Sequence, residues 1–298
     1  MDASDEFGLL SRRLMLTGTL ATGAALSAPA FAAQPALATM PREAGIPSDP
    51  ATRTAINRRV RMRGDKGLVF WWFRGRNYAQ QGARLIPLCE LIFGSMMDIT
   101  PTADGGLDVV QYELGFRTAL NGTDRAEKLH NPVTGEMVDV PFAPVGPTRL
   151  HYGADNAPQL PANVGGSRMT IEHVPDIYYR LGDTLCFQTH TAARVETPGQ
   201  RDRVVNDMSM ICSPMREALD PKRGFASATA HGSDVTDYAR WWKMPADAGT
   251  QSLRSIGQKV ARWQDMPADW LAMVARTDPE MARDPLAVLR RKEAVYKN

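Results

Sequence analysis

Two histidines and one glutamate are the side chains of this sequence best suited to acid–base chemistry. His173 and His190 each stand inside a run of residues typical of a β-strand, and Glu113 stands in another. Imidazole titrates near neutral pH, so a histidine in a pocket can accept or donate a proton. A carboxylate nearby can orient the reacting group or assist the transfer. His190, His173 and Glu113 are therefore the candidate catalytic residues.

Two other roles for the histidines stay open. A metal site needs three or more converging ligands, and His151, His173 and His190 with a carboxylate would be such a set. The simpler role is structural, with each imidazole hydrogen-bonded locally or facing solvent. The five histidines lie in separate segments, so only the fold could bring them together. We assign no metal ligands and leave the cofactor open.

Glu113 and Arg117 lie four residues apart on one face of a predicted strand. If that face is interior, the two charged groups would orient a polar ligand, since buried charges require partners. If it is exterior, they are ordinary surface charges. Tyr112 lies on the opposite face, which would line an apolar pocket or pack under helices.

Other candidate ligand-binding residues surround these strands. Arg74 and Tyr78 follow an aromatic run and would line the mouth of a pocket, whereas Arg194 shares a face with His190 if the strand alternates. The ligand-binding set is therefore Arg74, Tyr78, Tyr112, Arg117 and Arg194.

The elements that must position these residues are mostly strands joined by short turns. Strand patterns are predicted over 68–73, 85–97, 107–120, 125–130, 136–142, 168–174, 185–195 and 204–212. Helices are predicted over 48–62, 237–243, 268–275 and 286–296. Loops are expected over 143–167, and a short helical or extended connection over 175–179. Asn121-Gly122 is a hairpin signal, from which the 125–130 strand would return along its neighbour.

These patterns predict a mainly β fold. We expect an antiparallel meander forming a closed or nearly closed lipocalin-like barrel, with flanking N-terminal and C-terminal helices. A β-sandwich is the alternative architecture. A barrel of about eight strands can hold one small ligand, whose aromatic or apolar character is suggested by the many tryptophans and tyrosines.

Composition and missing motifs exclude several function classes. The formal net charge of +2 is too small for a protein whose main partner is nucleic acid. Neither a strand–helix G-x-G-x-x-G nor a G-x-x-x-x-G-K-[ST] motif occurs, which argues against a nucleotide-binding α/β fold. G-x-S-x-G and H-E-x-x-H are absent too, so no serine hydrolase or zinc protease is indicated.

Three cysteines leave at least one thiol unpaired within the chain. A disulfide between Cys186 and Cys212 is compatible with their strand-like surroundings. We favour buried thiols for all three cysteines, Cys89 included.

The N-terminus has the pattern of an export signal. Arg12 and Arg13 precede a short apolar stretch diluted by Gly and Thr, and Ala30-Phe31-Ala32 is a cleavage site that leaves Ala33 as the new terminus. The S-R-R-x-x-L core resembles the twin-arginine signal. A membrane anchor is the alternative, but a spanning helix needs about 20 apolar residues. We therefore expect a signal peptide over 1–32, a flexible leader over 33–47, and one domain over 48–298 that is periplasmic, without a stable anchor after cleavage.

An ordered set of short motifs resembles one known family. The motifs are Trp71-Trp72-Phe73-Arg74-Gly75, Tyr112-Glu113-Leu114, Asn131-Pro132-Val133-Thr134-Gly135-Glu136, Gly146-Pro147, Trp241-Trp242-Lys243-Met244-Pro245, Gly257-Gln258-Lys259-Val260 and Asp265-Met266-Pro267. Together they resemble the DUF1838 family, over roughly residues 50–290. The resemblance implies a single unit and brings no catalytic assignment with it.

Three function classes remain. The first is a cofactor-independent lyase, isomerase or hydrolase in which His190 or His173 moves a proton and Arg117 or Arg74 stabilises developing negative charge. The second is a periplasmic ligand-binding or carrier protein that uses the same pocket without turnover. The third is a scaffold whose barrel is filled by side chains. The partners expected are a small-molecule ligand and the twin-arginine export machinery.

Overall fold

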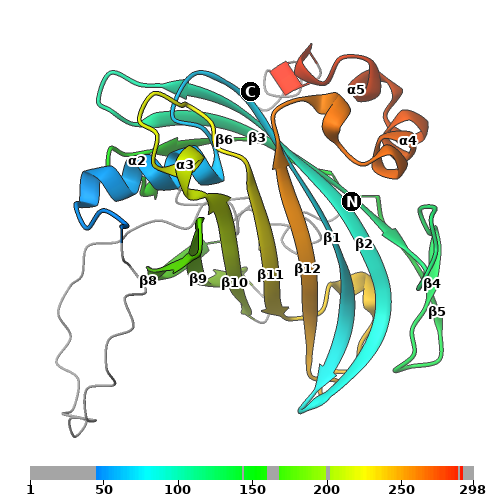
Figure 1. Ribbon diagram of the computed structural model, residues 1–298. Coiled ribbons are helices and arrows are strands. Elements are labelled where there is room, and N and C mark those ends of the chain that lie inside the picture. Colours follow the sequence, from blue (N-terminus) through cyan, green and yellow to red (C-terminus); the bar gives the residue numbers. More distant parts are fainter. Residues whose placement is uncertain (1–44, 143, 160–167, 199–201, 288, 291–298) are drawn as a thin grey trace, which may run out of the picture.

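The computed structural model describes residues 45–142, 144–159, 168–198, 202–287, 289 and 290. Its main element is a ten-stranded antiparallel sheet in the order β7-β6-β3-β2-β1-β12-β11-β10-β9-β8. The sheet curls into a half-barrel (Figure 1). The predicted fold class, a mainly β and nearly closed lipocalin-like barrel with flanking helices, is confirmed.

The strands are long at the centre of the sheet and short at one edge. Their bounds are β1 Gly67–Gln81, β2 Arg84–Pro101, β3 Leu107–Thr118, β6 Val145–Tyr152, β7 Pro158–Gln159, β8 Arg168–Leu181, β9 Thr184–Glu196, β10 Arg203–Pro214, β11 Ala228–Thr236 and β12 Thr250–Val260. Every neighbouring pair is antiparallel. Strand alternation therefore divides the side chains between an inner and an outer face of the curl.

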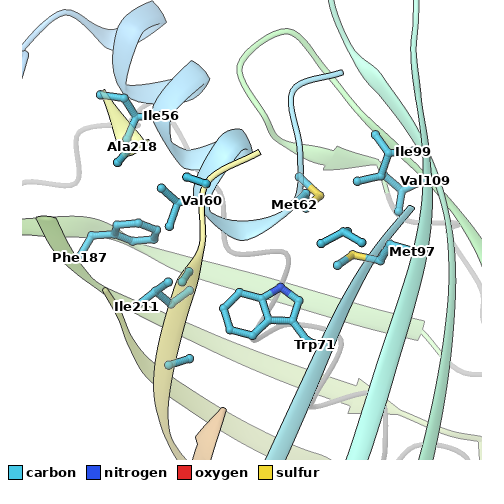
Figure 2. Close-up of a cluster of buried hydrophobic side chains, with 14 of the residues drawn as sticks. Ile56, Val60, Met62, Trp71, Met97, Ile99, Val109, Phe187, Ile211 and Ala218 are labelled. Carbon is cyan, nitrogen blue, oxygen red and sulfur yellow. The ribbon is translucent and has the colours of Figure 1, made fainter. Parts of the chain in front are cut away.

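The inner face is packed at one end by helix α2 (Pro50–Arg61), which Asp49 caps by accepting a hydrogen bond from the Thr52 amide at 2.8 Å. Ile56 and Val60 of α2 pack over the sheet with Phe187, Ile211 and Trp71 (Figure 2). The Phe73 ring packs directly against Gly257, where a Cβ atom would lie 2.4 Å from the ring and would clash with it. This end of the curl is a conventional apolar core.

The same helix joins the two edges of the sheet. Asn57 Nδ2 donates to Asp176 Oδ2 on β8 at 3.0 Å, and Asn57 Oδ1 accepts from Asn156 Nδ2, next to β7, at 3.4 Å. Arg58 adds donors to the carbonyls of Gly105 and Gly153 at 2.8 and 2.6 Å. Helix α2 therefore bridges a gap that no strand pairing spans among the described residues.

The outer face is covered over β1–β3 by the C-terminal helices α4 (Ala268–Thr277) and α5 (Pro279–Arg283) (Figure 1). Trp270 of α4 lies so close to Gly94 that a Cβ there would meet its ring at 2.5 Å. The Trp270 Nε1 donates to the Leu114 carbonyl at 3.1 Å. Tyr112 and Phe116 of β3 face these helices, so their strand is buried on both sides.

Smaller elements complete the fold. The hairpin β4 (Lys128–His130) and β5 (Met137–Asp139) forms a separate two-stranded sheet. It packs through Leu129 and Val138 against Trp242, which belongs to the 3-10 helix η2 (Arg240–Trp242). Two further short helices are α3 (Met215–Ala218) and η3 (Trp263–Asp265).

Several predicted elements are confirmed, with longer strands than the patterns indicated. The helices expected over 48–62 and 268–275 are α2 and α4, the 237–243 helix is reduced to η2, and residues 286, 287, 289 and 290 of the terminal helix are helical. The expected connection over 175–179 belongs instead to β8, which has a bulge between Val174 and Ile177. Such a bulge accommodates Pro175 at the sheet edge.

Other sequence expectations were wrong. The segment 143–167 was expected to be loops, but it contains β6 and β7, and β11 and β12 were not predicted. The 125–130 segment begins back along β3, where the Ala126 amide donates to the Arg117 carbonyl at 2.8 Å, but its strand β4 then pairs with β5 and not with β3. The expected signal peptide over 1–32 and most of the leader over 33–47 lie outside the described residues. Among the helices of the described part of the chain, none combines the length and apolar character needed to cross a membrane.

Candidate functional site

Two aspartates face each other on the inner side of the sheet. Asp207 of β10 and Asp234 of β11 are direct partners in the antiparallel register, and they share the face of Ile211 and Ala230. Directly opposed residues of such strands have Cβ atoms roughly 4.5–5.5 Å apart. Asp207 is 1% exposed and Asp234 is 2% exposed. The sheet therefore holds two carboxyl groups together away from solvent.

Burial and mutual repulsion set the charge of this pair. Removal from water raises the pKa of Asp207 well above its usual value, and the neighbouring Asp234 raises it further. A hydrogen bond from Ser209 Oγ to Asp207 Oδ1 at 3.3 Å acts in the opposite direction but is weaker. Two carboxylates that share a site cannot both ionise easily. The pair is thus arranged to keep one proton to higher pH than a single aspartate would.

Three more polar side chains continue this group on the same face. Thr236 follows Asp234 along β11, and Gln251 of β12 lies opposite Thr236. Ser255 of β12 lies opposite Gly232. These three residues are 7–8% exposed. We call Asp207, Asp234, Thr236, Gln251 and Ser255 the inner polar patch.

The inner polar patch is incompletely hydrogen-bonded within the described part of the chain. Asp207 Oδ2, Thr236 Oγ1, Gln251 Oε1 and Ser255 Oγ are buried atoms without a hydrogen-bond partner there. The Gln251 amide group is oriented by its donation to Asn77 Oδ1 at 3.2 Å. Buried polar atoms without partners are uncommon in proteins and cost about 1–3 kcal/mol each. Four of them on three adjacent strands mark this patch as a candidate functional site.

Glu113 forms a second polar group on the inner face. It is 2% exposed, and its Oε1 accepts a hydrogen bond from Gln111 Nε2 at 2.7 Å. Gln111 Nε2 also donates to Ser95 Oγ at 3.3 Å. Glu113 lies on β3, five strands along the sheet from Asp207 on β10. The curl of the sheet turns both strands toward the same interior (Figure 1).

A pocket opens at the end of the sheet, and the residues that line it are close in sequence to the inner polar patch but do not belong to it. It has a volume of about 330 Å³ and is lined by residues that include Arg203, Asp237, Tyr238 and Gly249. Asp237 directly follows Thr236, and Gly249 precedes Gln251 by two residues. Burial raises the pKa of Tyr238, whose hydroxyl donates to the Ala248 carbonyl at 3.1 Å. The opening is large enough for a small organic molecule.

The structure separates the three predicted catalytic residues. Glu113 is on the inner face, as the interior alternative required. His190 is on the outer face, half-buried, opposite Val174 and Met208. The backbone of His173 pairs with Thr191, which in turn pairs with Asp207, so His173 occupies the register row of the aspartate pair.

The predicted ligand-binding residues are divided as well. Arg117 is inner and buried, with its guanidinium 4.9 Å from the Trp241 ring centroid. Tyr112 is outer and buried under the C-terminal helices. Arg74 forms an outer, exposed ion pair with Asp269 at 2.5 Å. Half-buried Tyr78 belongs to the same outer side of β1.

Arg194 is exposed on the outer side, 3.7 Å from Asp202. It lines a pocket of about 390 Å³ with Glu172 and Glu196.

The cysteines differ from the preferred expectation. Cys186 and Cys212 are direct partners on β9 and β10 and form a disulfide with a Cα–Cα distance of 4.2 Å. The prediction of three buried thiols was therefore wrong for this pair, because strand register brings the two side chains together. Cys89 is a buried thiol whose Sγ accepts a hydrogen bond from Asn77 Nδ2 at 3.5 Å. Within the described residues, no three His, Cys, Asp or Glu side chains converge as a metal ion requires.

Sequence reasoning missed the aspartate pair. The available signal was the alternation of Asp207 and Ser209 with apolar Met208 and Met210 along a predicted strand. It was not sufficient because β11 was not recognised as a strand, so Asp234 had no assigned position.

Comparisons with known proteins give no relative from which roles could be transferred. No protein-family model matches the chain, and no curated protein matches it either.

Proposed function

We propose that this protein binds a small organic molecule on the inner face of its half-barrel and transfers a proton to or from it through Asp207 and Asp234. Such a protein would be a cofactor-independent lyase, isomerase or hydrolase. The observation that carries the proposal is the buried, directly opposed aspartate pair, in which Asp207 Oδ2 has no hydrogen-bond partner among the described residues.

The chemistry follows from one proton shared by two carboxyl groups. The ionised carboxylate acts as a base or a nucleophile, and the protonated one acts as an acid. Both functions are then available within one site at the same pH. The His173 backbone lies on the same register row as the pair. Glu113 is a separate buried carboxyl group on the inner face, because its row meets β1 at Trp71 and the row of the pair meets β1 at Asn77, six residues further along. In this proposal Asp207 and Asp234, and not His190, are the acid–base residues.

An epoxide tests this proposal directly. A carboxylate oxygen that attacks an epoxide carbon of glycidol forms an ester bond. The C–O bond of the ring breaks at that carbon, and a neighbouring carboxylic acid protonates the oxygen that is released. The chain from residue 33 onward would be incubated with glycidol and digested, and the ester would be located by mass spectrometry. We expect one adduct per chain, on Asp207 or Asp234, formed fastest where the pair holds a single proton.

Two variants make this test specific. Asp207→Asn should abolish the labelling of both positions, because either the acid or the base is lost. Asp139→Asn removes an aspartate that is exposed on β5 and paired with Lys128, so it should leave the labelling unchanged. Labelling of exposed carboxylates alone, at the same rate in all three proteins, would reject the proposal.

A ligand-binding or carrier protein without turnover is the alternative. It is favoured by the packed aromatic side chains of the inner face, such as Trp71, Phe73 and Phe93. A carrier needs no titratable pair, so the buried aspartates favour catalysis.

We also propose that the chain is exported by the twin-arginine route and belongs to the DUF1838 family. The Cys186–Cys212 disulfide supports an oxidising compartment such as the periplasm. Replacing Arg12 and Arg13 with Lys should leave unprocessed precursor in the cytoplasm, as detected by fractionation and immunoblotting. Processed protein outside the cytoplasm in the Lys variant would contradict this route.

A further inference from the structure

The hydrogen-bonding character of the inner polar patch points to the class of its ligand. We infer that the patch binds a neutral polyhydroxylated molecule, such as a sugar or a cyclic polyol, and this inference rests on the proposed function. It replaces the aromatic or apolar ligand that composition alone suggested.

The unpartnered atoms of the patch define what a ligand must offer. Gln251 Oε1 can only accept, because it is an amide oxygen, and its orientation is given by the Nε2 of the same side chain, which donates to Asn77 Oδ1. Thr236 Oγ1 and Ser255 Oγ can each donate and accept. The aspartate pair, with one proton between two carboxyl groups, also donates and accepts.

A hydroxyl group matches all of these requirements, since it donates one hydrogen bond and accepts others. An ammonium group only donates, so it would leave the donors of the patch unused. A carboxylate or phosphate is negatively charged, so the aspartate pair would repel it. Its oxygens only accept hydrogen bonds, so Gln251 Oε1 would stay unpaired. A hydrocarbon would satisfy none of the buried oxygens and nitrogens.

The spacing of the patch requires several hydroxyl groups. Its members occupy three adjacent strands, β10, β11 and β12, and neighbouring strands are roughly 4.8 Å apart. Thr236 lies opposite Gln251, and Asp234 is two residues from Thr236 on the same face. One hydroxyl cannot reach all of these groups, whereas hydroxyls distributed around a six-membered ring can.

The surroundings of the patch suit a ring with apolar faces. Phe73 and Phe93 stack at 4.8 Å between ring centroids on the inner side of β1 and β2. Phe73 lies over Gly257, the next inner position after Ser255 on β12. Trp71 also stacks on Phe73, at 5.4 Å, so these buried rings form an apolar wall next to the patch, and the polar atoms of the patch are what would hold the hydroxyls of the ring.

A double variant that removes two hydroxyl groups of the patch tests their role in ligand binding. Thr236→Val and Ser255→Ala delete oxygen atoms that make no hydrogen bond with the described residues, so the double variant should fold at least as stably as the wild type. The matched control is Thr229→Val with Ser233→Ala, two residues on the outer side of β11.

Binding would be measured by calorimetry and thermal unfolding with glucose, myo-inositol, glucuronate and indole as probes. We expect glucose or myo-inositol to bind the wild type and the control variant and to raise their Tm. The double variant should bind about tenfold or more weakly, because two hydrogen bonds are lost.

The outcomes separate this inference from the proposed function. Binding of indole or glucuronate in place of the two neutral polyols would overturn the inference, as would equal polyol binding by the double variant. No binding of either polyol would overturn it as well. If the wild type binds neither polyol but glycidol labels its Asp207 or Asp234, the proposed function stands and only the inference on the ligand fails. If the wild type is not labelled either, both proposals are rejected.

Discussion

Lys259 and Asp207 are both buried ionisable residues on the inner face, but their surroundings differ. Lys259, below α2, donates to the carbonyls of Arg59 and Met62 at 2.7 and 3.0 Å. It lies 4.2 Å from the Phe225 ring centroid. Asp207 has one hydrogen bond from Ser209 and a second carboxyl group opposite it.

The difference is the reason why we assign Lys259 a structural role and propose a functional one for Asp207. Lys259 caps the C-terminal carbonyls of α2 and so fixes the helix that bridges the sheet edges. Trp71 Nε1 supports the same helix end by donating to the Arg61 carbonyl at 2.8 Å. Nothing comparable in the described residues satisfies Asp207 Oδ2. Lys259 has its hydrogen-bond partners within the fold, whereas Asp207 Oδ2 has none among the described residues, which is why we propose that Asp207 acts on another molecule.

Loss of Lys259 and loss of the disulfide should have the two largest effects on stability, of similar size. In Lys259→Met, two buried carbonyls lose their donor, so we expect the free energy of unfolding to fall by about 3 kcal/mol. Urea unfolding followed by tryptophan fluorescence would measure it. Lys222→Met, at an exposed position, is the control and should change stability little. Equal stability of the two variants would remove the structural role of Lys259.

The disulfide provides a stability change away from both groups. Replacing Cys186 and Cys212 with Ala opens a link across 26 residues, which should lower the free energy of unfolding by about 3 kcal/mol. Labelling of the folded protein by glycidol should be unchanged, because the two cysteines are on the outer face. A loss of labelling in the folded double variant would show that the inner site depends on the outer face.

Asp207→Asn should stabilise the protein while it abolishes labelling. Because the folded-state pKa of Asp207 is raised, the folded protein retains a proton that the unfolded chain releases. The resulting stability is fully present below the unfolded pKa near 3.8 and is lost as the pH rises toward the folded value.

An amide in place of the Asp207 carboxyl group avoids this loss. We expect Asp207→Asn to be more stable than the wild type at pH 7, by a margin that becomes smaller toward pH 4. Urea unfolding at both pH values would measure the gain. A destabilised Asp207→Asn at pH 7 would mean that the carboxyl group is structural, like Lys259.

His151 should give the smallest change. Its Nδ1 lies 2.9 Å from Asp108 Oδ1 and its Nε2 lies 3.3 Å from Asp104 Oδ2, and the Asp108 hydrogen bond is the main cause of its raised pKa. This stabilisation is complete below the unfolded pKa near 6.5 and is lost as the pH rises through the folded value. In His151→Gln, the small decline in stability above neutral pH should disappear, as Tm measurements across the pH range would detect. An unchanged pH profile would contradict it.

The sequence predicted the barrel better than the site. Alternation along 107–120 identified β3 and placed Glu113 and Tyr112 on opposite faces of it, because successive side chains of a strand point to alternate sides. The Ser48-Asp49-Pro50 signal located the start of α2 for the same local reason. The aspartate pair depends on the register of β10 against β11, which is a non-local property. Its recognition also required β11, where Gly232 and His231 weaken the strand pattern.

The outer position of His190 has a similar explanation. Alternation grouped it correctly with Cys186 and Arg194, but it does not say which side of a sheet faces inward. That choice is made by α2, whose apolar side chains cover Phe187 on the other face of β9.

The protonation of the aspartate pair tests the central claim most directly. Infrared difference spectra of the wild type minus Asp207→Asn would be recorded from about pH 4 to pH 8, around the usual aspartate range. We predict the band of a protonated carboxyl group that persists at about pH 6 in the wild type and is missing from Asp207→Asn. If both aspartates are fully ionised by about pH 5, as exposed carboxyl groups are, the pair shares no proton and the acid–base account is contradicted.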